Sequence, residues 1–522
     1  MNVVKRALPV VLLLAFVAQS YFASRLKSPT FDEPAHVAAG LSYLSRGVFH
    51  ANLQHPPLIK ELSALGLLAG GVRWPYSQAA DDLIANPAGK PGRDWDVGNE
   101  IIAAGGPDRV MRWARLPMIL VALLLGIAIY AWGRRILGET AALGALFLFA
   151  LDPTLVAHSF LVTTDVGMAA FTVLFSGALW WYVEQPGRGR LIACGVALGC
   201  ALGSKYSGVF LLPVGATLLL AADRRKTPPV ERLRAFALMC LVALAVIEIL
   251  YLFRATPFTY LEGLRRVNAD HDPNYQVFFD GELRRRFTAY FAAAYLLKEP
   301  LAAILLGGIG AIVILRKKAL RTIDRLFLLT PPLALFAAYS LWADNLGIRY
   351  IIPVLPFAWL AGGAALQWLV GQRSWWTRGV AAALCGWMIV AAAGIYPDHL
   401  SYFNEAACVL DTPRFLGADG GSRCGAAWLD DSNVDWGQGV KQLKQWLDEH
   451  AAGRPVHLLY WGTFPPENYG IHATEAPATP GGRPELYVMS AHYVARVGVT
   501  DPHVRNATPI AIVGHALWVY EF

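Results

Sequence analysis

Apolar stretches of about twenty residues recur along most of the chain, and short polar connections separate them. A helix needs about twenty apolar residues to cross the hydrocarbon core of a membrane. The fifth and sixth stretches are the shortest, with little more than Lys205-Tyr206-Ser207 between them. The pattern predicts about eleven transmembrane helices, near residues 6–24, 114–132, 139–157, 164–183, 190–204, 207–222, 233–253, 300–315, 326–342, 350–370 and 376–395.

The pattern changes after Tyr396, where charge rises and the apolar runs shorten to strand length. GAAWLDD, VHLLYWG, ELYVMS and HALWVYE predict strands, and VDWGQGVKQLKQWLDEH predicts an amphipathic helix. The fold class is therefore mainly α, with a membrane domain over residues 1–395. Residues 396–522 are expected to form a small α/β domain.

Two long polar stretches interrupt the membrane pattern, at residues 25–113 and 254–299. The first begins with two short helical patterns, the second of which opens at His55-Pro56-Pro57 and closes at Gly70-Gly71. Both helices are expected to lie along the membrane surface. The second half of this first loop is rich in Pro and Gly and is expected to cover a site as a lid. In the second loop, residues 285–297 predict another surface helix.

Composition excludes an ordinary soluble enzyme, since 55% of the residues are hydrophobic and 16% are charged. The net charge of +7 comes from short connections instead of one basic domain, which favours membrane orientation over nucleic-acid binding. Basic residues mark every second connection and predict a multi-pass inner-membrane protein with a cytoplasmic, uncleaved N-terminus. They are Lys5-Arg6, Arg134-Arg135, Arg188 and Arg190, Arg224-Arg225-Lys226, Arg316-Lys317-Lys318, and Arg373 with Arg378.

Cys408 and Cys424 are the two cysteines that this topology places outside the cytoplasm, so we expect a disulfide between them. Cys194, Cys200, Cys240 and Cys385 lie within predicted spans and are expected to be apolar fillers. No Cys/His zinc pattern occurs in the sequence.

The strongest chemical signal is the loop SPTFDEPAHVAAGLSYLSRGVFHANLQHPPL, just beyond the first span. Asp32 and Glu33 are adjacent, Pro34 suits the first turn of a helix, and His36 lies one turn after Asp32. TFDEPAH followed by QHPPL resembles the first external loop of the GT-C glycosyltransferases that use polyprenyl-phosphate sugars. Protein O-mannosyltransferases (glycosyltransferase family 39) and lipid A aminoarabinose transferases belong to that superfamily. The resemblance implies that Asp32 is the general base.

Glu33 and Asp165 are expected to join Asp32 as catalytic residues, and Lys205 and Arg349 are expected to bind the donor phosphate. Asp165, in the short connection before the fourth span, resembles the second carboxylate of the superfamily, although helix capping by Thr164 or Asp165 is the alternative. Lys205 and Arg349 lie at external span ends in motifs that resemble those of the superfamily, where they would bind the donor phosphate. Lys205 alone would also be explained by snorkelling to the membrane surface.

Several other side chains are candidates for substrate contact. Asp430, Asp431 and Asp435 lie in DDSNVDWGQ, which resembles a tail motif of a bacterial GT-C subgroup and follows a predicted strand, where open sheets bind ligands. Capping by Asn433 or Asp435 is the alternative. The full set of possible contacts is His36, His55, His158, Arg115, Lys298, Asp431 and Asp435.

The resemblance implies an inverting glycosyltransferase that moves a sugar from a polyprenyl-phosphate donor to a hydroxyl on a protein, lipid or glycan. The chain lacks the large cytosolic domain of a nucleotide-sugar enzyme, so the donor is expected to be lipid-linked. No cofactor is required by this mechanism. A metal-dependent relative would use Asp32, Glu33, His36 and Asp165 as ligands of a divalent cation. A transporter of lipid-linked sugars predicts charges within the spans and repeated halves, which the sequence does not show.

Overall fold

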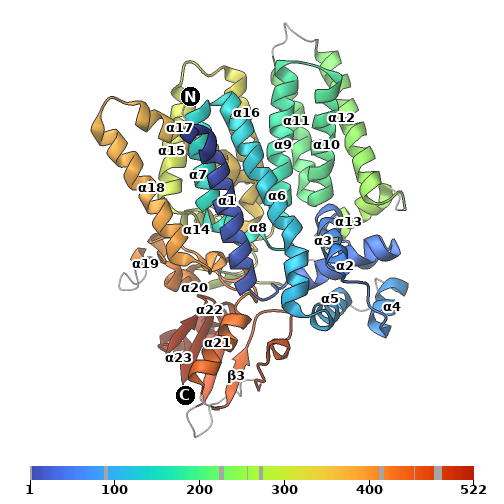
Figure 1. The fold of residues 1–522 in the computed structure, drawn as a ribbon, viewed down its shortest axis with the longest axis vertical. Coiled ribbons are helices and arrows are strands. Elements are labelled where there is room, and N and C mark those ends of the chain that lie inside the picture. The colour runs from blue at the N-terminus through green and yellow to red at the C-terminus, as the bar shows by residue number, and fades with distance from the viewer. Residues whose placement is uncertain are drawn as a thin grey trace.

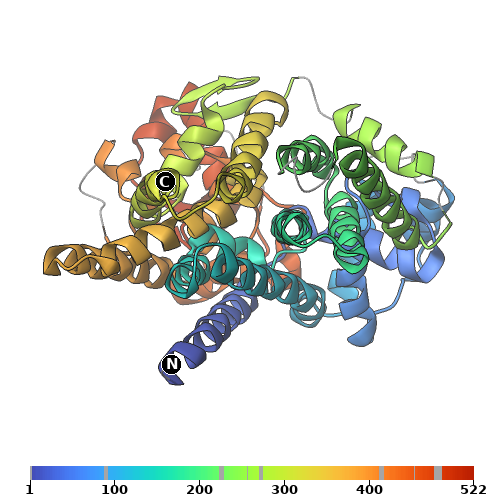
Figure 2. The same ribbon diagram turned by 90° about the horizontal axis from the view of Figure 1, so that it is seen from above.

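The computed structural model describes residues 3–86, 92–222, 228–254, 257–269, 274–410, 417–451, 453–474 and 485–521. A layer of long helices runs side by side, and a small domain with a sheet caps one end of it (Figure 1). Seen from above, α1 and α18 lie at the rim of the helical layer (Figure 2). The protein is therefore a mainly helical, polytopic membrane protein with a small C-terminal domain, as the hydropathy pattern predicted.

Helices occupy the positions of all the predicted spans. Within the described ranges, seven are long and apolar enough to cross a membrane, or up to nine if each of two bent pairs forms one span. The helices of the predicted fifth and sixth spans, α10 and α11, have 17 and 11 residues and are not among these nine. The helices of the layer are α1 (Val3–Leu26), α6 (Pro107–Ile136), α7 (Glu139–Leu151), α8 (Pro153–Ser159), α9 (Asp165–Glu184), α10 (Arg188–Ser204), α11 (Leu211–Ala221), α12 (Pro229–Leu250), α15 (Leu301–Arg316), α16 (Thr322–Trp342), α17 (Leu355–Gly371) and α18 (Trp375–Ile395).

The two bent pairs turn at prolines. α7 and α8 meet at an angle of 64° at Asp152-Pro153, and α14 (Tyr290–Lys298) meets α15 at 114° at Glu299-Pro300. Proline cannot donate the backbone hydrogen bond that would continue a helix. The Asp152 side chain accepts a hydrogen bond from the Leu155 amide and so caps the new helix.

The first long loop is largely helical. α2 (Glu33–Arg46) and α3 (Leu58–Ala69) confirm the two predicted short helices, while α4 (Gln78–Ala85) and α5 (Arg93–Ala104) stand where a polar lid was predicted. The surface-helix prediction for α2 is wrong, because its residues from Glu33 to Tyr43 are all buried. Gly98 explains the close packing, since a Cβ there would lie 1.9 Å from the Pro34 carbonyl oxygen. Residues 87–91 of the predicted lid lie outside the described residues.

The second long loop also differs from its prediction. It contains α13 (Pro257–Ala269) and an antiparallel hairpin of β1 (Val277–Phe279) and β2 (Glu282–Arg284). The predicted helix over residues 285–297 begins only at Tyr290, as α14. Phe287 and Asn345 explain the late start, because the Phe287 amide donates to the Asn345 side chain instead of to a helical turn.

The C-terminal domain has a four-stranded mixed sheet in the order β3-β4-β6-β5, in which only β3 and β4 are parallel. α21 (Val440–His450) packs its apolar face on this sheet, as predicted. The strands are β3 (Val456–Leu459), β4 (Leu486–Ser490), β5 (Ala511–Val513) and β6 (Leu517–Glu521), with α22 (Ala491–Thr500) and α23 (Pro502–Asn506) between β4 and β5.

The strand predicted over GAAWLDD is wrong, because residues Gly425–Trp428 form the short helix α20. A short apolar run does not by itself distinguish a strand from a buried helical turn. The turn packs closely on Phe403, since a Cβ at Gly425 would lie 2.3 Å from the Phe403 ring. The predicted disulfide between Cys408 and Cys424 is present directly before α20.

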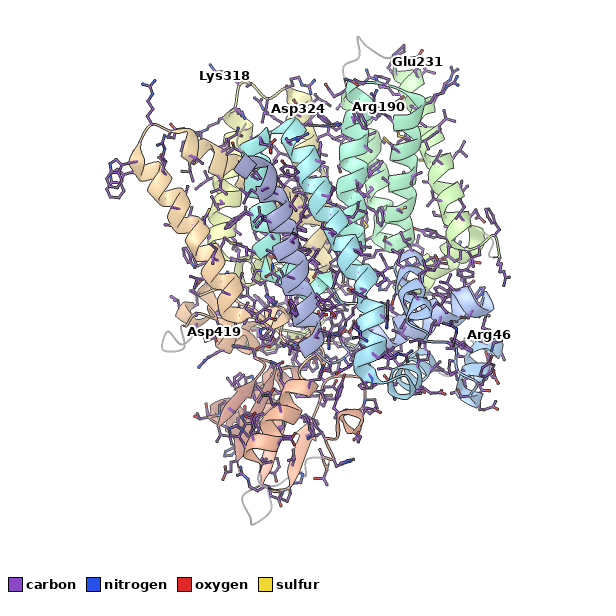
Figure 3. The ribbon with its side chains drawn as sticks, in the orientation of Figure 1. Arg46, Arg190, Glu231, Lys318, Asp324 and Asp419 are labelled. Carbon is purple, nitrogen blue, oxygen red and sulfur yellow. A yellow bond between two sulfur atoms is a disulfide. The ribbon has the colours of Figure 1, made fainter. Side chains whose placement is uncertain are left out.

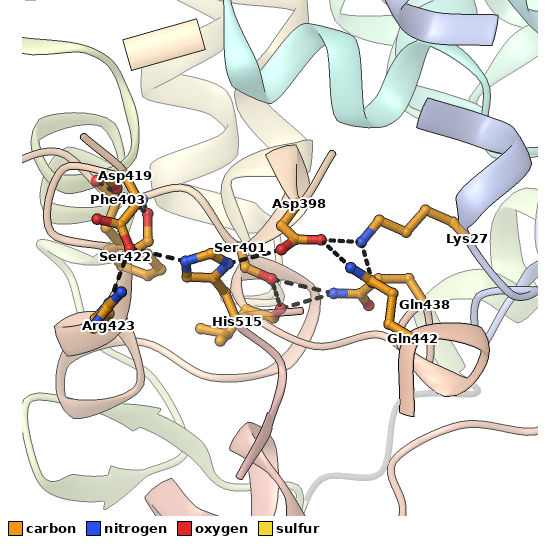
Figure 4. Close-up of polar contacts among 11 residues, drawn as sticks. Lys27, Asp398, Ser401, Phe403, Asp419, Ser422, Arg423, Gln438, Gln442 and His515 are labelled. Carbon is orange, nitrogen blue, oxygen red and sulfur yellow. Dashed lines mark hydrogen bonds and ion pairs between the residues drawn. The ribbon is translucent and has the colours of Figure 1, made fainter. Parts of the chain in front are cut away.

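Polar contacts join the C-terminal domain to the ends of α1 and α18 (Figure 4). Asp398, just beyond α18, pairs with Lys27, and its other oxygen lies 2.8 Å from the Nδ1 atom of His515 in the β5–β6 turn. The Nε2 atom of His515 lies 2.9 Å from Asp419, which also pairs with Arg423. Burial opposes a charged imidazole, but the two carboxylates outweigh it and raise the pKa of His515 from 6.5 to about 9.

The raised pKa makes the stability of the domain contact depend on pH. The protonated His515 ring stabilises the folded protein. This stabilisation is complete below the pKa of the unfolded state, near 6.5, and is lost as the pH rises through the folded-state pKa of about 9. We expect His515→Gln to lower the melting temperature in detergent near pH 6 and to differ less from wild type near pH 10. His503→Gln, at an exposed position of the same domain, is the control. An equal loss for His515→Gln at both pH values would refute the charge-based contact.

Candidate active site

Asp32 and Arg349 form an ion pair at the end of the helical layer that faces the C-terminal domain. Asp32 is the residue before α2, and Arg349 lies in η3 (Ile348–Val354), the 3-10 turn that leads into α17. The Nη1 atom of Arg349 lies 2.9 Å from Oδ2 of Asp32. The Asp32 side chain keeps 23% of its surface exposed, so solvent reaches it.

A second ion pair joins the predicted catalytic residue Asp165 to Lys205, a predicted phosphate contact. Asp165 begins α9, and Lys205 follows the last residue of α10. Their side chains meet at 2.6 Å and are nearly buried. Thr164 is the N-cap residue of α9, and its side chain makes no capping hydrogen bond.

Tyr350 connects the two pairs. Its ring centroid lies 4.2 Å from Nζ of Lys205 and 5.6 Å from Cζ of Arg349. A cation over an aromatic face is attracted by the ring quadrupole. The structure thus brings Asp32, Asp165, Lys205 and Arg349 into one cluster, with each predicted cation on one predicted carboxylate.

His36 and His55 lie beside this cluster, with ring centroids 5.8 Å apart. Burial and then Lys60 lower the pKa of His36. Burial, His36 and Lys205 lower the pKa of His55 well below its usual value. Both rings are therefore neutral at pH 7. Nδ1 of His36 contacts the Val162 carbonyl oxygen, so that nitrogen carries the proton and Nε2 is an acceptor.

Glu33 points away from the cluster into a buried pair with Arg115. Arg115 donates to both Glu33 carboxylate oxygens, at 2.9 and 2.6 Å, and both side chains are at most 1% exposed. The Thr30 and Val162 amides also donate to Glu33. The remaining guanidinium N–H groups of Arg115 bind three backbone carbonyls at the end of α1. Glu33 and Arg115 therefore stabilise the loop, and neither side chain faces the cluster.

His158 and Lys298 are buried near the same end. The His158 ring lies 6.3 Å from that of Trp436, and its Nδ1 atom has no hydrogen-bond partner. Lys298 donates to the carbonyls of Leu400, at 2.7 Å, and Asn433. Lys298 therefore joins α14 to the C-terminal segment and is not free for a ligand.

The three acids of the DDSNVDWGQ segment do not converge on one point. Asp430 accepts from Arg496 at 2.6 Å, and Asp431 accepts from the Tyr275 hydroxyl at 3.0 Å. Asp435 is buried, which raises its pKa to about 6, and it accepts from Ser490. The segment also does not follow a strand, so the prediction of a ligand site at a strand end is wrong in its premise.

The residues that the structure describes contain no group of three or more His, Cys, Asp or Glu side chains arranged to hold a metal ion. Of the four ligands of the metal-dependent alternative, Glu33 is committed to Arg115 and Asp32 to Arg349.

Sequence reasoning missed two aromatic residues of the site, Tyr350 and, in the C-terminal segment, Trp436. The ring centroid of Trp436 lies 4.2 Å from Cζ of Arg349, and the residue is 2% exposed. The sequence signal was a tryptophan within the DDSNVDWGQ motif, which drew attention only to its acids.

Residues 108–251 match the family model described as dolichyl-phosphate-mannose-protein mannosyltransferase. This part of the membrane domain is therefore similar to that family of membrane glycosyltransferases. The match lies C-terminal to the TFDEPAH and QHPPL motifs and includes Asp165 and Lys205. No curated protein matches the chain.

Solved structures of similar shape come from three kinds of enzyme. ArnT from Cupriavidus metallidurans, bound to undecaprenyl phosphate, is 14% identical over 100% of this chain and 98% of its own, with a TM-score of 0.49. The archaeal oligosaccharyltransferase AglB from Archaeoglobus fulgidus is 13% identical over 92% and 62%, with a TM-score of 0.47. The S. cerevisiae protein O-mannosyltransferase Pmt1-Pmt2 complex is 18% identical over 54% and 39%, with a TM-score of 0.33.

Proposed function

We propose that the protein is an inverting glycosyltransferase that moves a sugar from a polyprenyl-phosphate donor to a hydroxyl acceptor. The observation that carries the proposal is the pair of carboxylate–cation contacts, Asp32–Arg349 and Asp165–Lys205, at one end of the membrane helices. An anionic lipid head can reach such a site from the membrane, and a polar acceptor can reach Asp32 from water. The sugar and the acceptor are left open.

In the proposed reaction the donor phosphate takes over the two cations. Arg349 and Lys205 each face a carboxylate in the resting site, and a phosphate is a stronger partner for a guanidinium because it offers more charge and acceptor oxygens. As Arg349 turns to the phosphate, Asp32 is left without its ion-pair partner. An unpaired carboxylate is a better proton acceptor.

Asp32 then removes the proton of the acceptor hydroxyl as its oxygen attacks C1 of the sugar. The C1–oxygen bond to the phosphate breaks on the opposite side, so one displacement inverts the anomeric centre. The electron pair of that bond leaves with the phosphate, whose developing charge the two cations stabilise. Asp165 holds Lys205 in place and helps to orient the acceptor. No cofactor enters these steps, and we expect a chelator to leave activity largely intact.

We further propose that the site faces the outside of the inner membrane. Arg190 and Lys318, on predicted cytoplasmic connections, lie with the N-terminus at one end of the helices, while Asp419 of the C-terminal region lies at the other (Figure 3). The positive-inside rule assigns the basic end to the cytoplasm. Arg224-Arg225-Lys226, also assigned there, lie outside the described residues.

The direct test is transfer in membranes that contain the protein. A panel of polyprenyl-phosphate sugars labelled in the sugar is added, and the labelled product is identified by mass spectrometry. Transfer to a protein, lipid or glycan that depends on intact Asp32 is the expected result. Movement of intact labelled donor across sealed vesicles, without any new glycosidic product, would instead favour the transporter.

Removal of either cation is expected to weaken phosphate binding. Each charged hydrogen bond contributes about 1.5–3 kcal/mol, so Arg349→Gln should weaken undecaprenyl phosphate binding about ten- to a hundredfold. The second cation is tested with the double variant Lys205→Gln/Asp165→Asn, because Lys205→Gln alone would leave the nearly buried Asp165 carboxylate without its partner.

Binding is measured by native mass spectrometry in detergent. Arg266→Gln, which breaks a surface ion pair with Glu262 on α13, is the matched control. Wild-type affinity in both site variants would place the phosphate elsewhere.

A further inference from the structure

The turn that carries Arg349 is held by the C-terminal segment. The Ser432 hydroxyl donates to the Leu346 carbonyl at 2.8 Å, and the Ile348 amide donates to the Asn433 side chain at 2.9 Å. Between them, Gly347 has a φ of +108°, and a Cβ there would lie 2.4 Å from the Ser432 hydroxyl oxygen. Only glycine fits this contact without strain, so the backbone before Arg349 is held against residues 432–433.

Trp436 of the same segment holds the side chain of Arg349. The guanidinium carbon lies 4.2 Å from the indole centroid, and Nη1 of the same group reaches Asp32. Trp436 is itself fixed on both sides of its backbone. Its amide donates to the Gln438 side chain at 2.6 Å, and its carbonyl accepts from the Phe31 amide at 2.8 Å. The indole is therefore anchored to the residue that precedes the proposed base.

We propose that Trp436 is a positioning residue of the active site, through which the C-terminal domain orients Arg349 for the donor phosphate. The inference rests on the proposed function. A flat indole face restrains a guanidinium to a parallel plane but leaves its N–H edge free to change partners. Arg349 can then move from Asp32 to a phosphate without being released into solvent. Without the indole, the long Arg349 side chain is mobile, and donor binding must offset the conformational entropy that this side chain loses when it becomes fixed.

Replacement of the indole is therefore expected to affect donor binding more than the chemical step. A cation–π contact contributes about a three- to thirtyfold effect. Trp436→Leu should weaken binding of undecaprenyl phosphate by that factor, and Trp436→Phe should lose less because a ring remains. In the transfer assay, KM for the donor should rise while kcat stays within about twofold. The matched control is Trp446→Leu, which replaces a tryptophan of helix α21 in the same domain.

A double-mutant cycle separates positioning from a general loss of structure. If Trp436 acts through Arg349, then Trp436→Leu should change binding less than about twofold in an Arg349→Gln background. The melting temperature of each variant is compared with that of the control, and Trp436→Phe replaces Trp436→Leu throughout if the latter does not fold. Additive losses would overturn the inference, as would wild-type binding by the single variants.

The same experiments distinguish this failure from failure of the proposed function. If wild-type protein binds undecaprenyl phosphate and transfers sugar while the Trp436 variants behave like wild type, only the positioning role is lost. If wild-type protein neither binds the lipid nor transfers sugar, the proposed function itself fails.

Discussion

Asp32→Asn is expected to lower turnover at least a hundredfold while the protein folds and binds undecaprenyl phosphate normally. A general base contributes about a hundred- to ten-thousandfold in rate, and asparagine cannot accept the proton. A purely structural role for Asp32, as the cap of α2, is the competing explanation. In the structure the Asp32 side chain makes no capping hydrogen bond, so the substitution removes a base and an ion-pair partner but no cap.

The measurement is single-turnover transfer with the donor identified by the labelled panel. Donor affinity should not fall, because Arg349 loses the carboxylate that competes with the phosphate. Asp108→Asn, at an exposed acid of the same outer region that pairs with Lys441, is the matched control. If Asp32→Asn keeps most of its turnover on the true substrates, Asp32 is not the base and Asp165 must be tested in its place.

Glu33→Gln is expected to act on stability, although Glu33 is the very next residue. Glu33 is fully buried and binds Arg115 through both oxygens. Removal of one partner of a buried ion pair costs about 3–5 kcal/mol, because the other charge stays buried without compensation. The amide NH₂ of glutamine would also face donors from Thr30 or Val162. We expect a much lower melting temperature in detergent.

The double variant Glu33→Gln/Arg115→Gln provides the control. Since it removes both buried charges, it should recover part of the stability that Glu33→Gln loses. Turnover per folded molecule of Glu33→Gln should stay within about tenfold of wild type, well above that of Asp32→Asn. A normal melting temperature together with a hundredfold loss of turnover would show that Glu33 takes part in the chemistry and not in the scaffold.

The different expectations for Asp32 and Glu33 illustrate what the motif alone leaves open. Their adjacency identified the loop, and Asp32 does lie with Asp165, Lys205 and Arg349 in one cluster. Nothing in TFDEPAH indicates which acid meets a solvent-accessible arginine and which meets a buried one. Arg115 was predicted as a possible substrate contact, and its five N–H groups are instead all used within the loop scaffold.

The sequence by itself determined up to nine of the eleven predicted membrane spans, the two short helices around the TFDEPAH and QHPPL motifs, the disulfide and, within the described residues, three of the four C-terminal strands. These features depend on hydrophobic length, local turn residues and compartment, all of which are local properties of the chain. The tertiary structure alone decided that Arg349 meets Asp32 across 317 positions and that Trp436 lies under the guanidinium. It also decided that Gly425–Trp428, the first half of GAAWLDD, are helical. Such contacts depend on which side chains the packed helices bring together, and that information is not carried by any local pattern.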